Sequence, residues 1–354
     1  MNVSGHDLGS EDRTFIIAEA GSNHNGDLET AKKLVDVAAD AGADAVKFQL
    51  FEADKLYVEN SGTDNNLDKE ASIHDVISTL ELPREWISDL HSYCEKQDIL
   101  FLATPFDEHA VDILDEYVPA YKVASSSVTH LPFLETVGAT GKPVLMSTGA
   151  HDLKEVETAV ETLEQAGASD VALFHCVAAY PTPLEKINVK TIDTLREEFS
   201  VPVGLSDHTE EPAIAPCAAV SRGAAMIEKH ITLDRSMDGP DHSFAIEPDE
   251  LDEMVTSIRQ TESALGDRTV DIQTIESHTY EVARRSVHAT HDIEPEERIT
   301  EQNTAILRPG NRVKGVPPGE YDDILGTTAT TTIPKDAGVT WEDVAADPQS
   351  DSSS

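Results

Sequence analysis

The chain has 354 residues, of which 39% are apolar and 26% are charged, a composition typical of a folded protein with a sizeable core. Lysine and arginine number 26 against 67 aspartate and glutamate residues, which gives a formal net charge of -41. Such a surface would repel nucleic acids and anionic membrane faces, because binding them requires clustered basic residues. We therefore expect no nucleic-acid partner and no membrane partner.

The sequence contains no apolar run near the roughly 20 residues that a membrane helix requires. Residues 1–12 are polar and acidic, without the apolar segment of a signal peptide, and we expect them to form a flexible arm. Cys94, Cys176 and Cys217 lie far apart in the sequence and form no CxxC motif. This cysteine usage indicates a reduced, cytoplasmic protein, and we interpret Cys176 and Cys217 as packing residues.

Short β-branched or apolar runs alternate with longer amphipathic stretches over residues 13–265. The expected strands are Phe15–Ala18, Ala45–Leu50, Ile99–Ala103, Ala120–Ala124, Val144–Ser147, Val171–His175, Val201–Leu205 and Ala225–Lys229. The expected helices are Glu29–Ala41, Pro83–Lys96, Glu108–Glu116, Pro132–Thr140, Leu153–Gln165, Val189–Phe199, Pro212–Arg222 and Glu250–Leu265. Eight βα units in about 250 residues predict an α/β protein with a (β/α)8 TIM barrel. An open doubly wound sheet is the alternative, but no GxGxxG follows the first strand.

The connection over residues 51–82 is long, polar and acidic, as is typical of a functional lid or an insert. The pattern changes after Leu265. We expect a linker over residues 266–279 and a small β-rich domain over residues 280–344, because short strands alternate there with turns rich in Thr, Pro and Gly. The acidic, serine-rich residues 345–354 are expected to form a disordered tail.

Two lysines occur within strands that are otherwise apolar. In a (β/α)8 barrel the chemistry is located at the C-terminal ends of the strands, where Lys47 and Lys122 are expected to lie. A buried lysine is costly unless it is paired, so these residues could form salt bridges inside the barrel. Alternatively, they could bind a phosphate or carboxylate together with the hydroxyls of Ser125, Ser147 and Ser206. We favour the anion site.

His208 and His230 follow the seventh and eighth expected strands. Two neutral imidazoles that meet at a barrel mouth suit a divalent metal ion, whereas a single buried histidine is more often a packed core residue. His175 could be a third ligand, although we favour an outer role for it. Glu19, at the end of the first strand, is either the partner of a lysine or a general acid or base.

Taken in chain order, the segments at the strand ends resemble the sialic acid synthase family. The motifs are IAEAGSNHNG, VKFQ, FLATPFD, YKVASSS, LMSTGA, HCVAAYPTP, GLSDHT and EKHITL, followed by GPDHSF. The C-terminal segment, with ARRSVHA, ILRPGN and ILG, is similar to the antifreeze-like (SAF, β-clip) domain of that family. The resemblance extends from about Phe15 to Val344. Members of this family join phosphoenolpyruvate to a six-carbon aldose and make nine-carbon nonulosonic acids.

The resemblance implies a role for each candidate residue. Phosphoenolpyruvate would be held by Lys47, Lys122, Ser125, Ser147 and Ser206. A divalent ion, Mn²⁺ or Mg²⁺, would be bound by His208 and His230. The implied catalytic residues are Glu19, Glu228 and His230. The implied sugar-binding residues are Asp241, Tyr180 and Arg308, with Arg308 reaching the site from the partner subunit of a domain-swapped homodimer.

One position departs from the family pattern. Two residues beyond Ser125 the family usually has an acidic residue that contacts the sugar, and this chain has Ser127. The implied reaction yields an N-acetylneuraminate-type product from an N-acetylmannosamine-type acceptor. Because of Ser127, a 2,4-diacetamido-trideoxyhexose, with a legionaminate- or pseudaminate-type product, is a serious alternative. A metal-dependent aldolase on the same fold and a non-catalytic carbohydrate-binding protein are more distant alternatives.

The charge also predicts a dependence on salt, as expected for a halophilic protein. At about 1 M salt the Debye length falls to roughly 3 Å, so that repulsion among the excess carboxylates is screened. We expect the melting temperature and the activity to rise as KCl increases from about 0.1 to about 2 M. Thermal unfolding followed by circular dichroism measures the first quantity. A melting temperature that does not change over this range would contradict the interpretation.

Overall fold

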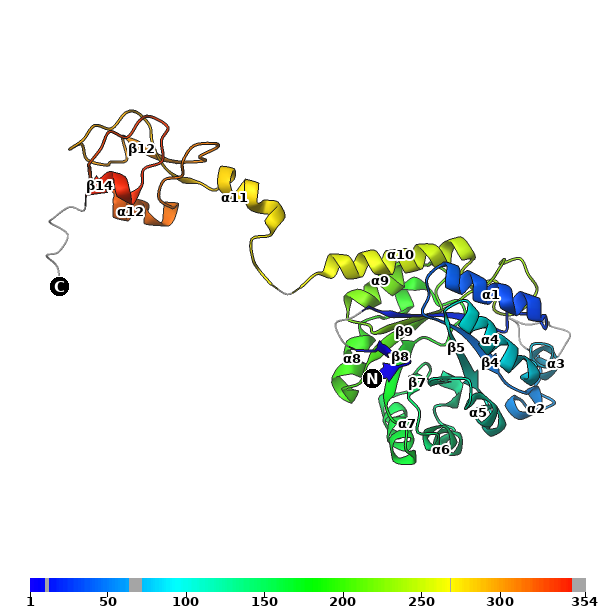
Figure 1. Ribbon diagram of the computed structural model, residues 1–354. Helices are drawn as coiled ribbons and strands as arrows, with labels where there is room; N and C mark the ends of the chain where they lie inside the picture. Colours follow the sequence, from blue (N-terminus) through cyan, green and yellow to red (C-terminus); the bar gives the residue numbers. More distant parts are fainter. Residues whose placement is uncertain (10–12, 64–71, 268, 346–354) are drawn as a thin grey trace. The chain divides into compact units, whose positions relative to one another are not determined.

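The computed structural model describes residues 1–9, 13–63, 72–267 and 269–345. The chain divides into two compact units, Met1–Gly266 and Asp267–Ser354, which are described separately (Figure 1). No helix within the described ranges is long and apolar enough to span a bilayer.

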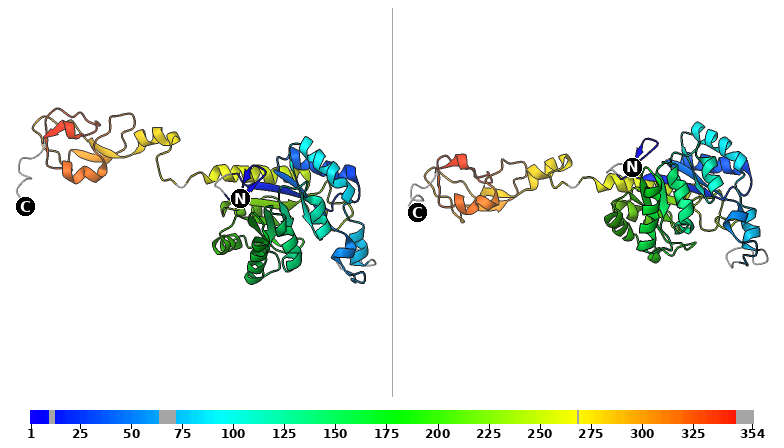
Figure 2. Two further views of the ribbon diagram at one scale, coloured as in Figure 1. Left: turned by 60° about the horizontal axis from the view of Figure 1, so that its bottom comes forward. Right: turned by 90° about the horizontal axis from the view of Figure 1, so that it is seen from below.

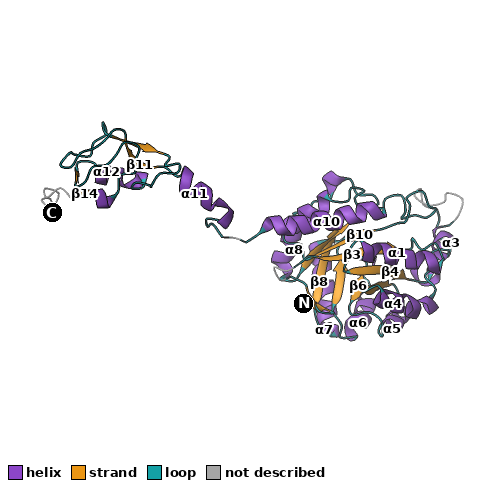
Figure 3. Cartoon of the chain, turned by 45° about the horizontal axis from the view of Figure 1, so that its top comes forward, coloured by secondary structure: helices purple, strands orange, loops and turns teal. Residues whose placement is uncertain are grey.

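The first unit is a barrel of eight parallel strands surrounded by helices (Figures 1 and 3). The strands pair in the order β5-β4-β3-β10-β9-β8-β7-β6, and β5 also packs against β6, so that the sheet closes. The strands are β3 (Phe15–Gly21), β4 (Ala45–Leu50), β5 (Leu100–Pro105), β6 (Tyr121–Val123), β7 (Val144–Ser147), β8 (Val171–Cys176), β9 (Val203–Asp207) and β10 (Met226–His230). The (β/α)8 prediction is confirmed.

The helices that follow these strands lie close to their expected positions. They are α1 (Leu28–Asp40), α4 (Ile87–Lys96), α5 (Glu108–Leu114), α6 (Leu131–Ala139), α7 (Leu153–Ala166), α8 (Thr191–Phe199), α9 (Ile214–Ser221) and α10 (Pro248–Leu265). Helix α7 shows why the pattern is readable from sequence. Asp152 and Glu155 form a capping box at its start, and Gly167 ends it with a left-handed φ of 117°. Its buried residues recur at helical spacing: Val156, Ala159, Val160 and Leu163.

The long connection after β4 contains two short helices, α2 (Ala53–Leu56) and α3 (Ile73–Ser78), while residues 64–71 of the expected lid or insert lie outside the described residues. A group of ion pairs fastens its start to the barrel. Arg84 lies 2.8 Å from Glu52 and 2.7 Å from Asp107, and Lys55 lies 3.3 Å from the same Asp107 carboxylate. Asp107 also caps α5 through the backbone N–H of Ala110 at 2.9 Å.

The N-terminal segment differs from the expectation of a flexible arm over residues 1–12. Strands β1 (Asn2–Val3) and β2 (His6–Asp7) form an antiparallel hairpin. Val3 and Leu8 are buried in a cluster with Phe15 and other residues from the barrel interior, so the hairpin covers one end of the barrel (Figure 2). The expectation is therefore wrong for residues 1–9, because two apolar side chains in a polar segment suffice to anchor it. Residues 10–12 lie outside the described residues.

The second unit has its own small core and short antiparallel sheets. Its elements are α11 (Ser277–Ala283), β11 (Ser286–Ala289), β12 (Thr304–Leu307), α12 (Tyr321–Ile324), β13 (Thr328–Ala329) and β14 (Val344–Ala345). The core is formed by Val287, Ala289, Ile293, Ile299, Val316, Ile324, Ala329, Ile333 and Val339. Helix α11 begins within the expected linker, and Ala345 pairs with Thr328 instead of starting the expected tail. Residues 346–354 lie outside the described residues.

The hairpin makes a testable contribution to stability. Leu8 is 4% exposed. Replacing it with alanine leaves a cavity, so Leu8→Ala should lower the free energy of unfolding by about 2–5 kcal/mol. Leu265→Ala is the control, since Leu265 is 51% exposed and its loss should cost less than about 0.5 kcal/mol. Urea unfolding at constant salt measures both. Equal stabilities of the two variants would mean that the hairpin is not packed against the barrel.

Candidate active site

The C-terminal ends of the barrel strands place six buried polar side chains in contact with one another. They are Glu19 on β3, Lys47 on β4, Lys122 on β6, Ser147 on β7, Ser206 on β9 and Glu228 on β10. All six were predicted site residues. They converge because the strands are parallel and pair in register, which brings their C-terminal ends to the same end of the barrel.

Glu228 is the counter-ion that the two lysines share. Its carboxylate oxygens lie 3.6 Å from Lys47 Nζ and 3.7 Å from Lys122 Nζ, and Oε1 accepts a hydrogen bond from the Ser206 hydroxyl at 2.9 Å. Lys47 has a closer partner in Glu19, at 2.5 Å. Lys122 instead donates to the Ser147 hydroxyl at 2.6 Å. The Lys122 ammonium therefore has no carboxylate at hydrogen-bond distance among the described residues.

The two carboxyl groups differ in proton affinity. Burial would raise the pKa of Glu228, but the charges of Lys122 and Lys47 outweigh it and lower the pKa to about 2. Burial and the nearby charge of Glu228 together raise the pKa of Glu19, although Lys47 opposes this shift. At neutral pH Glu228 is therefore a fixed negative charge, whereas Glu19 is the carboxyl group better suited to exchange a proton.

The two lysines also differ. Burial lowers the pKa of Lys122 and the charge of Lys47 lowers it further, although the charge of Glu228 opposes this shift. For Lys47, burial is outweighed by Glu19 and Glu228, which raise the pKa. A buried ammonium group with a lowered pKa is stabilised by any anion that binds beside it. Of the two lysines, Lys122 is therefore the stronger candidate to bind an anion.

Ser125 lies beside this cluster, at the start of the short 3-10 helix Ser125–Ser127. Its hydroxyl accepts from the backbone N–H of Gly149 at 3.1 Å and lies 3.2 Å from the thiol of Cys176. A Cβ on Gly149 would lie 2.7 Å from that sulfur, so only glycine fits between the two strand ends. Cys176 thus packs against a predicted site residue, a contact that the sequence did not reveal. Ser127, the last residue of the same 3-10 helix, is buried.

His208 and His230 lie together in a second group of side chains at the C-terminal end of the barrel, which we call the mouth. The ring centroids of His208 and His230 are 5.7 Å apart, and the ring of Tyr180 lies 4.2 Å from that of His208. Nδ1 of His208 lies 2.8 Å from the carbonyl oxygen of Val177, so this nitrogen carries the proton and Nε2 is left with a free lone pair. Burial lowers the pKa of both imidazoles, and for His230 the charge of Lys47 and the neighbouring His208 add to the effect.

Asp241 lies near His230 and near the carboxylate of Glu19. One of its oxygens lies 3.6 Å from Nδ1 of His230. It also lies 3.4 Å from the position that a Cβ on Gly21 would occupy, and Gly21 has a left-handed φ of 53°. Burial and the charge of Glu19 raise the pKa of Asp241 to about 7. The predicted sugar-binding residues Asp241 and Tyr180 therefore both contact the predicted metal ligands.

Two further mouth residues were missed from the sequence. Gln49 donates to Glu19 at 2.9 Å, and Lys47 donates to the hydroxyl of Thr104 at 3.1 Å. A signal existed for Gln49, because it lies two residues after Lys47 and so faces the same side of β4. Thr104 is one of several polar residues at the end of β5, and nothing in the sequence distinguished it.

Two predicted residues lie elsewhere. Nε2 of His175 lies 2.6 Å from the carbonyl oxygen of Ile187, which agrees with an outer role. Arg308 belongs to the second unit, where it follows β12 directly and precedes the turn at Gly310. The backbone N–H of Gly310 donates to the carbonyl of Val282 at 3.1 Å, which anchors this turn to α11.

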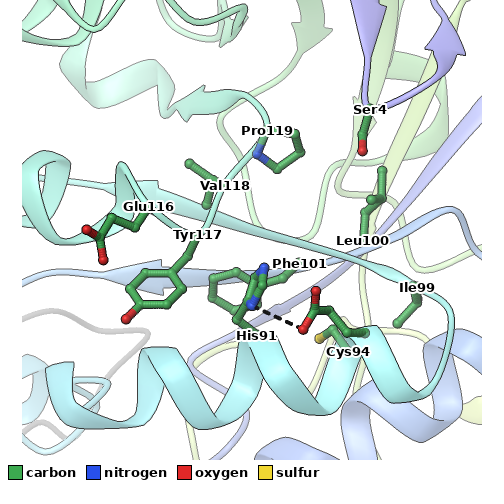
Figure 4. A pocket seen from close by; sticks show the side chains of 11 residues that line it. Ser4, His91, Cys94, Ile99, Leu100, Phe101, Glu116, Tyr117, Val118 and Pro119 are labelled. Atoms are coloured by element: carbon green, nitrogen blue, oxygen red, sulfur yellow. Dashed lines mark ion pairs between the residues drawn. The ribbon is translucent and has the colours of Figure 1, made fainter.

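A separate pocket of about 330 Å³ opens at the opposite end of the barrel (Figure 4). It is lined by the last turns of α4, the start of β5 and the segment before β6, and it includes Ser4 of the N-terminal hairpin. His91, Glu95 and Tyr117 are among its lining side chains. It lies at the N-terminal ends of the strands, so it is distinct from the mouth.

A closed (β/α)8 barrel with buried lysines, carboxylates and histidines at its strand ends defines an enzyme-like site of the TIM-barrel class. The comparisons with known proteins identify the class further. The NeuB family matches residues 34–270, and the SAF domain matches residues 284–345. The chain belongs to the NeuB family and ends in a SAF domain.

Three similar proteins illustrate the relationship. The spore coat polysaccharide biosynthesis protein SpsE of Bacillus subtilis is 40% identical, with 97% of each chain covered. The N,N'-diacetyllegionaminic acid synthase of Campylobacter jejuni is 39% identical over 92% of this chain and 98% of its own. The crystal structure of the N-acetylneuraminic acid (sialic acid) synthetase of Leptospira borgpetersenii, in complex with citrate, is 34% identical. It covers 79% of this chain and 95% of its own, with a TM-score of 0.72.

Further relatives at 33–34% identity are the pseudaminic acid synthase of Campylobacter jejuni and the human N-acetylneuraminate-9-phosphate synthase. The relatives are thus sialic, legionaminic and pseudaminic acid synthases, which make this chain an enzyme of the nonulosonic acid synthase family. Their names differ in the acid that each enzyme makes.

The sharing of Glu228 predicts an order of stabilities. Glu228→Gln leaves Lys122 without its ion-pair partner, whereas Glu19→Gln leaves both lysines beside Glu228. Losing one partner of a buried ion pair costs about 3–5 kcal/mol, and we expect this for Glu228→Gln and a smaller loss for Glu19→Gln. Urea unfolding in about 2 M KCl measures both variants. The reverse order would contradict the role of Glu228 as the shared counter-ion.

Proposed function

We propose that this enzyme condenses phosphoenolpyruvate with the open-chain form of an N-acylated amino-hexose and water, giving a nine-carbon nonulosonic acid and inorganic phosphate. The observation that carries the proposal is the buried Lys122, whose ammonium group lacks a close carboxylate but lies beside the Ser147 hydroxyl. Such a group is stabilised by an anion that binds beside it, and the names of the relatives restrict the reaction class.

The anion would be bound by the lysine side of the mouth. Lys47 and Lys122 would hold the phosphate and carboxylate of phosphoenolpyruvate, with hydroxyl contacts from Ser125, Ser147 and Ser206. These residues come from β4, β6, β7 and β9 and the turn after β6, so the anion would be surrounded by several strands. Binding on several sides would fix the orientation of the reacting C3 atom.

The imidazole side fits a divalent ion, Mn²⁺ or Mg²⁺. His208 and His230 are neutral, and Val177 fixes the tautomer of His208 so that Nε2 is available. In the part of the chain that the structure describes, no three His, Cys, Asp or Glu side chains are grouped to hold a metal, so water or substrate oxygens would complete the shell. When bound, such an ion supplies Lewis acidity that polarises an aldehyde oxygen.

The carboxyl groups suit the remaining steps. C3 of phosphoenolpyruvate attacks the aldehyde carbon, and positive charge develops at C2, where water adds and phosphate leaves by C–O cleavage. Glu228, with its pKa near 2, would stabilise the positive charge. Glu19, with its raised pKa, would exchange the proton of the water or of the new hydroxyl. Asp241 and Tyr180 would contact the sugar beside the histidines.

The acceptor is tested by a product screen. Purified enzyme with Mn²⁺ and phosphoenolpyruvate is offered N-acetylmannosamine and a 2,4-diacetamido-trideoxyhexose separately, and mass spectrometry detects the products. We expect a nonulosonic acid and an equal amount of phosphate from at least one acceptor. The small, uncharged side chain of Ser127 favours the deoxy sugar, which has fewer hydroxyls to bind. Phosphate release without a sugar product, or no reaction with either acceptor, would contradict the proposed function.

A domain-swapped homodimer is part of the proposal, based on the family arrangement. The arginine of the Arg308-Pro309-Gly310 turn would contact the acyl group of the sugar in the partner's barrel, since a planar guanidinium suits a carbonyl oxygen. Arg308→Ala should then raise the sugar KM or lower kcat, with little effect on the KM for phosphoenolpyruvate.

Mixed dimers test the subunit exchange. At a sugar concentration below the wild-type KM, Arg308→Ala and Glu19→Ala subunits are each expected to have low activity alone. After mixing, one site of each hybrid dimer would carry both intact residues, so activity should reappear. Native mass spectrometry confirms that subunits have exchanged. Exchanged but inactive dimers would mean that each site is completed within one chain.

A further inference from the structure

A buried ion pair lies behind the two histidines, on the outer side of the barrel wall. Strands β9 and β10 pair in parallel, with Ser206 opposite Glu228 and Asp207 opposite Lys229. Successive residues of a strand point to opposite faces. Ser206 and Glu228 face the mouth, where they are hydrogen-bonded, so Asp207 and Lys229 face away from it.

Lys229 forms hydrogen bonds with the residues on both sides of His208. Its Nζ lies 2.5 Å from Oδ2 of Asp207 and donates to the carbonyl oxygen of Thr209 at 2.6 Å. Asp207 in turn accepts from the backbone N–H and from the hydroxyl of Thr209, each at 3.0 Å. His208 is therefore the middle residue of a turn whose two flanking residues are bound to one ammonium group.

His208 lies in this turn, beyond the paired part of β9 and β10. Strand β9 ends at Asp207 and its pairing with β10 ends at the same residue, so the β9–β10 ladder does not include His208. The ring is oriented by Val177 and the backbone carbonyl accepts from Thr182 at 2.7 Å, but both of these residues belong to the neighbouring loop after β8. Within β9 and β10, the contact that fixes the backbone on both sides of His208 is therefore the Asp207–Lys229 ion pair.

Stability alone does not explain this pair. Lys229 and Asp207 are each 1% exposed, so both charges are almost completely removed from water. Replacing a buried ion pair by apolar residues of similar volume is often neutral or stabilising. Lys229 also directly precedes His230, so a single residue connects the backbone of one predicted metal ligand to the turn that carries the other.

We propose that Lys229 and Asp207 are positioning residues for the divalent-ion site, which set the position of His208 relative to His230. This inference rests on the proposed function, since it assumes that the two imidazoles bind the ion. Groups that orient metal ligands without touching the metal typically change metal affinity by 10- to 100-fold when they are removed.

The test measures Mn²⁺ binding directly, by titration calorimetry on protein freed of metal with EDTA. The paired replacement Lys229→Met with Asp207→Leu removes both charges and leaves no unpaired charge buried. We expect it to fold, with a melting temperature near that of the wild type, and to bind Mn²⁺ about 10- to 100-fold more weakly. Thr209→Val is the milder variant. It removes one hydroxyl from the turn and should weaken binding to a smaller extent.

Mn²⁺ binding is measured in the same way for two control variants. His208→Ala should abolish Mn²⁺ binding. Arg259→Met breaks another partly buried pair, in which Arg259 lies 3.2 Å from Asp44 near the N-terminal ends of the strands, and should bind Mn²⁺ as the wild type does.

Wild-type affinity in both the paired replacement and Thr209→Val, with His208→Ala inactive in binding, would overturn the positioning role and leave the metal site intact. If the paired replacement does not fold, Thr209→Val decides the question alone. If the wild-type protein itself binds no Mn²⁺, the proposed metal site is wrong and the positioning role is overturned with it.

Discussion

The carboxylate of Glu228 lies between Lys47 and Lys122, and the arrangement of the barrel mouth depends on this shared counter-ion. Two ammonium groups buried side by side repel each other and lose their hydration, so they remain charged only if a negative charge is fixed between them. Glu228 supplies that charge without forming a short ion pair with either lysine. Lys122, which donates to the Ser147 hydroxyl, therefore has no close carboxylate that would compete with an anion entering the mouth.

The same residue divides the mouth into two sides. On one side lie the lysines and hydroxyls, and on the other lie the imidazoles, Tyr180 and Asp241. The carboxyl groups between them have different proton affinities, because Glu228 is next to two positive charges whereas Glu19 is next to one positive and one negative charge. A site with one permanent carboxylate and one that exchanges protons suits a reaction in which positive charge develops before water adds.

The acidic surface and the two lysines of the mouth would act on an anion at different ranges. A net charge of -41 repels an anionic substrate over the Debye length, which at low salt exceeds about 10 Å. An anion bound beside the lysines would be only a few ångströms from them, where salt screens little. High salt therefore removes the long-range repulsion and leaves the local attraction. Local attraction of this kind would let the proposed anion site bind its substrate although the chain has few basic residues.

Much of the fold was predictable from sequence because each part has a local signal. The eight βα units follow from hydrophobic periodicity, and the ends of α7 follow from its capping residues. Lys47, Lys122 and His208 could be singled out as candidate site residues from the sequence, since an ionisable residue at the end of a buried strand is costly without a purpose. Glu228 became a candidate only through the resemblance to a known family. The N-terminal hairpin was missed, because only its contact with the barrel interior distinguishes Val3 and Leu8 from isolated apolar residues.

Which groups pair with which was decided by the tertiary structure. The sequence by itself determined that lysines and carboxylates lie at strand ends, but either glutamate could have paired with either lysine. The closing of the barrel set the distances that leave Lys122 without a close carboxylate and place Cys176 beside Ser125. The pairing of Lys229 was equally invisible, because its partners belong to the neighbouring strand β9 and to the turn after it. Pairings of this kind depend on strand register, and register arises only when all eight strands pack together.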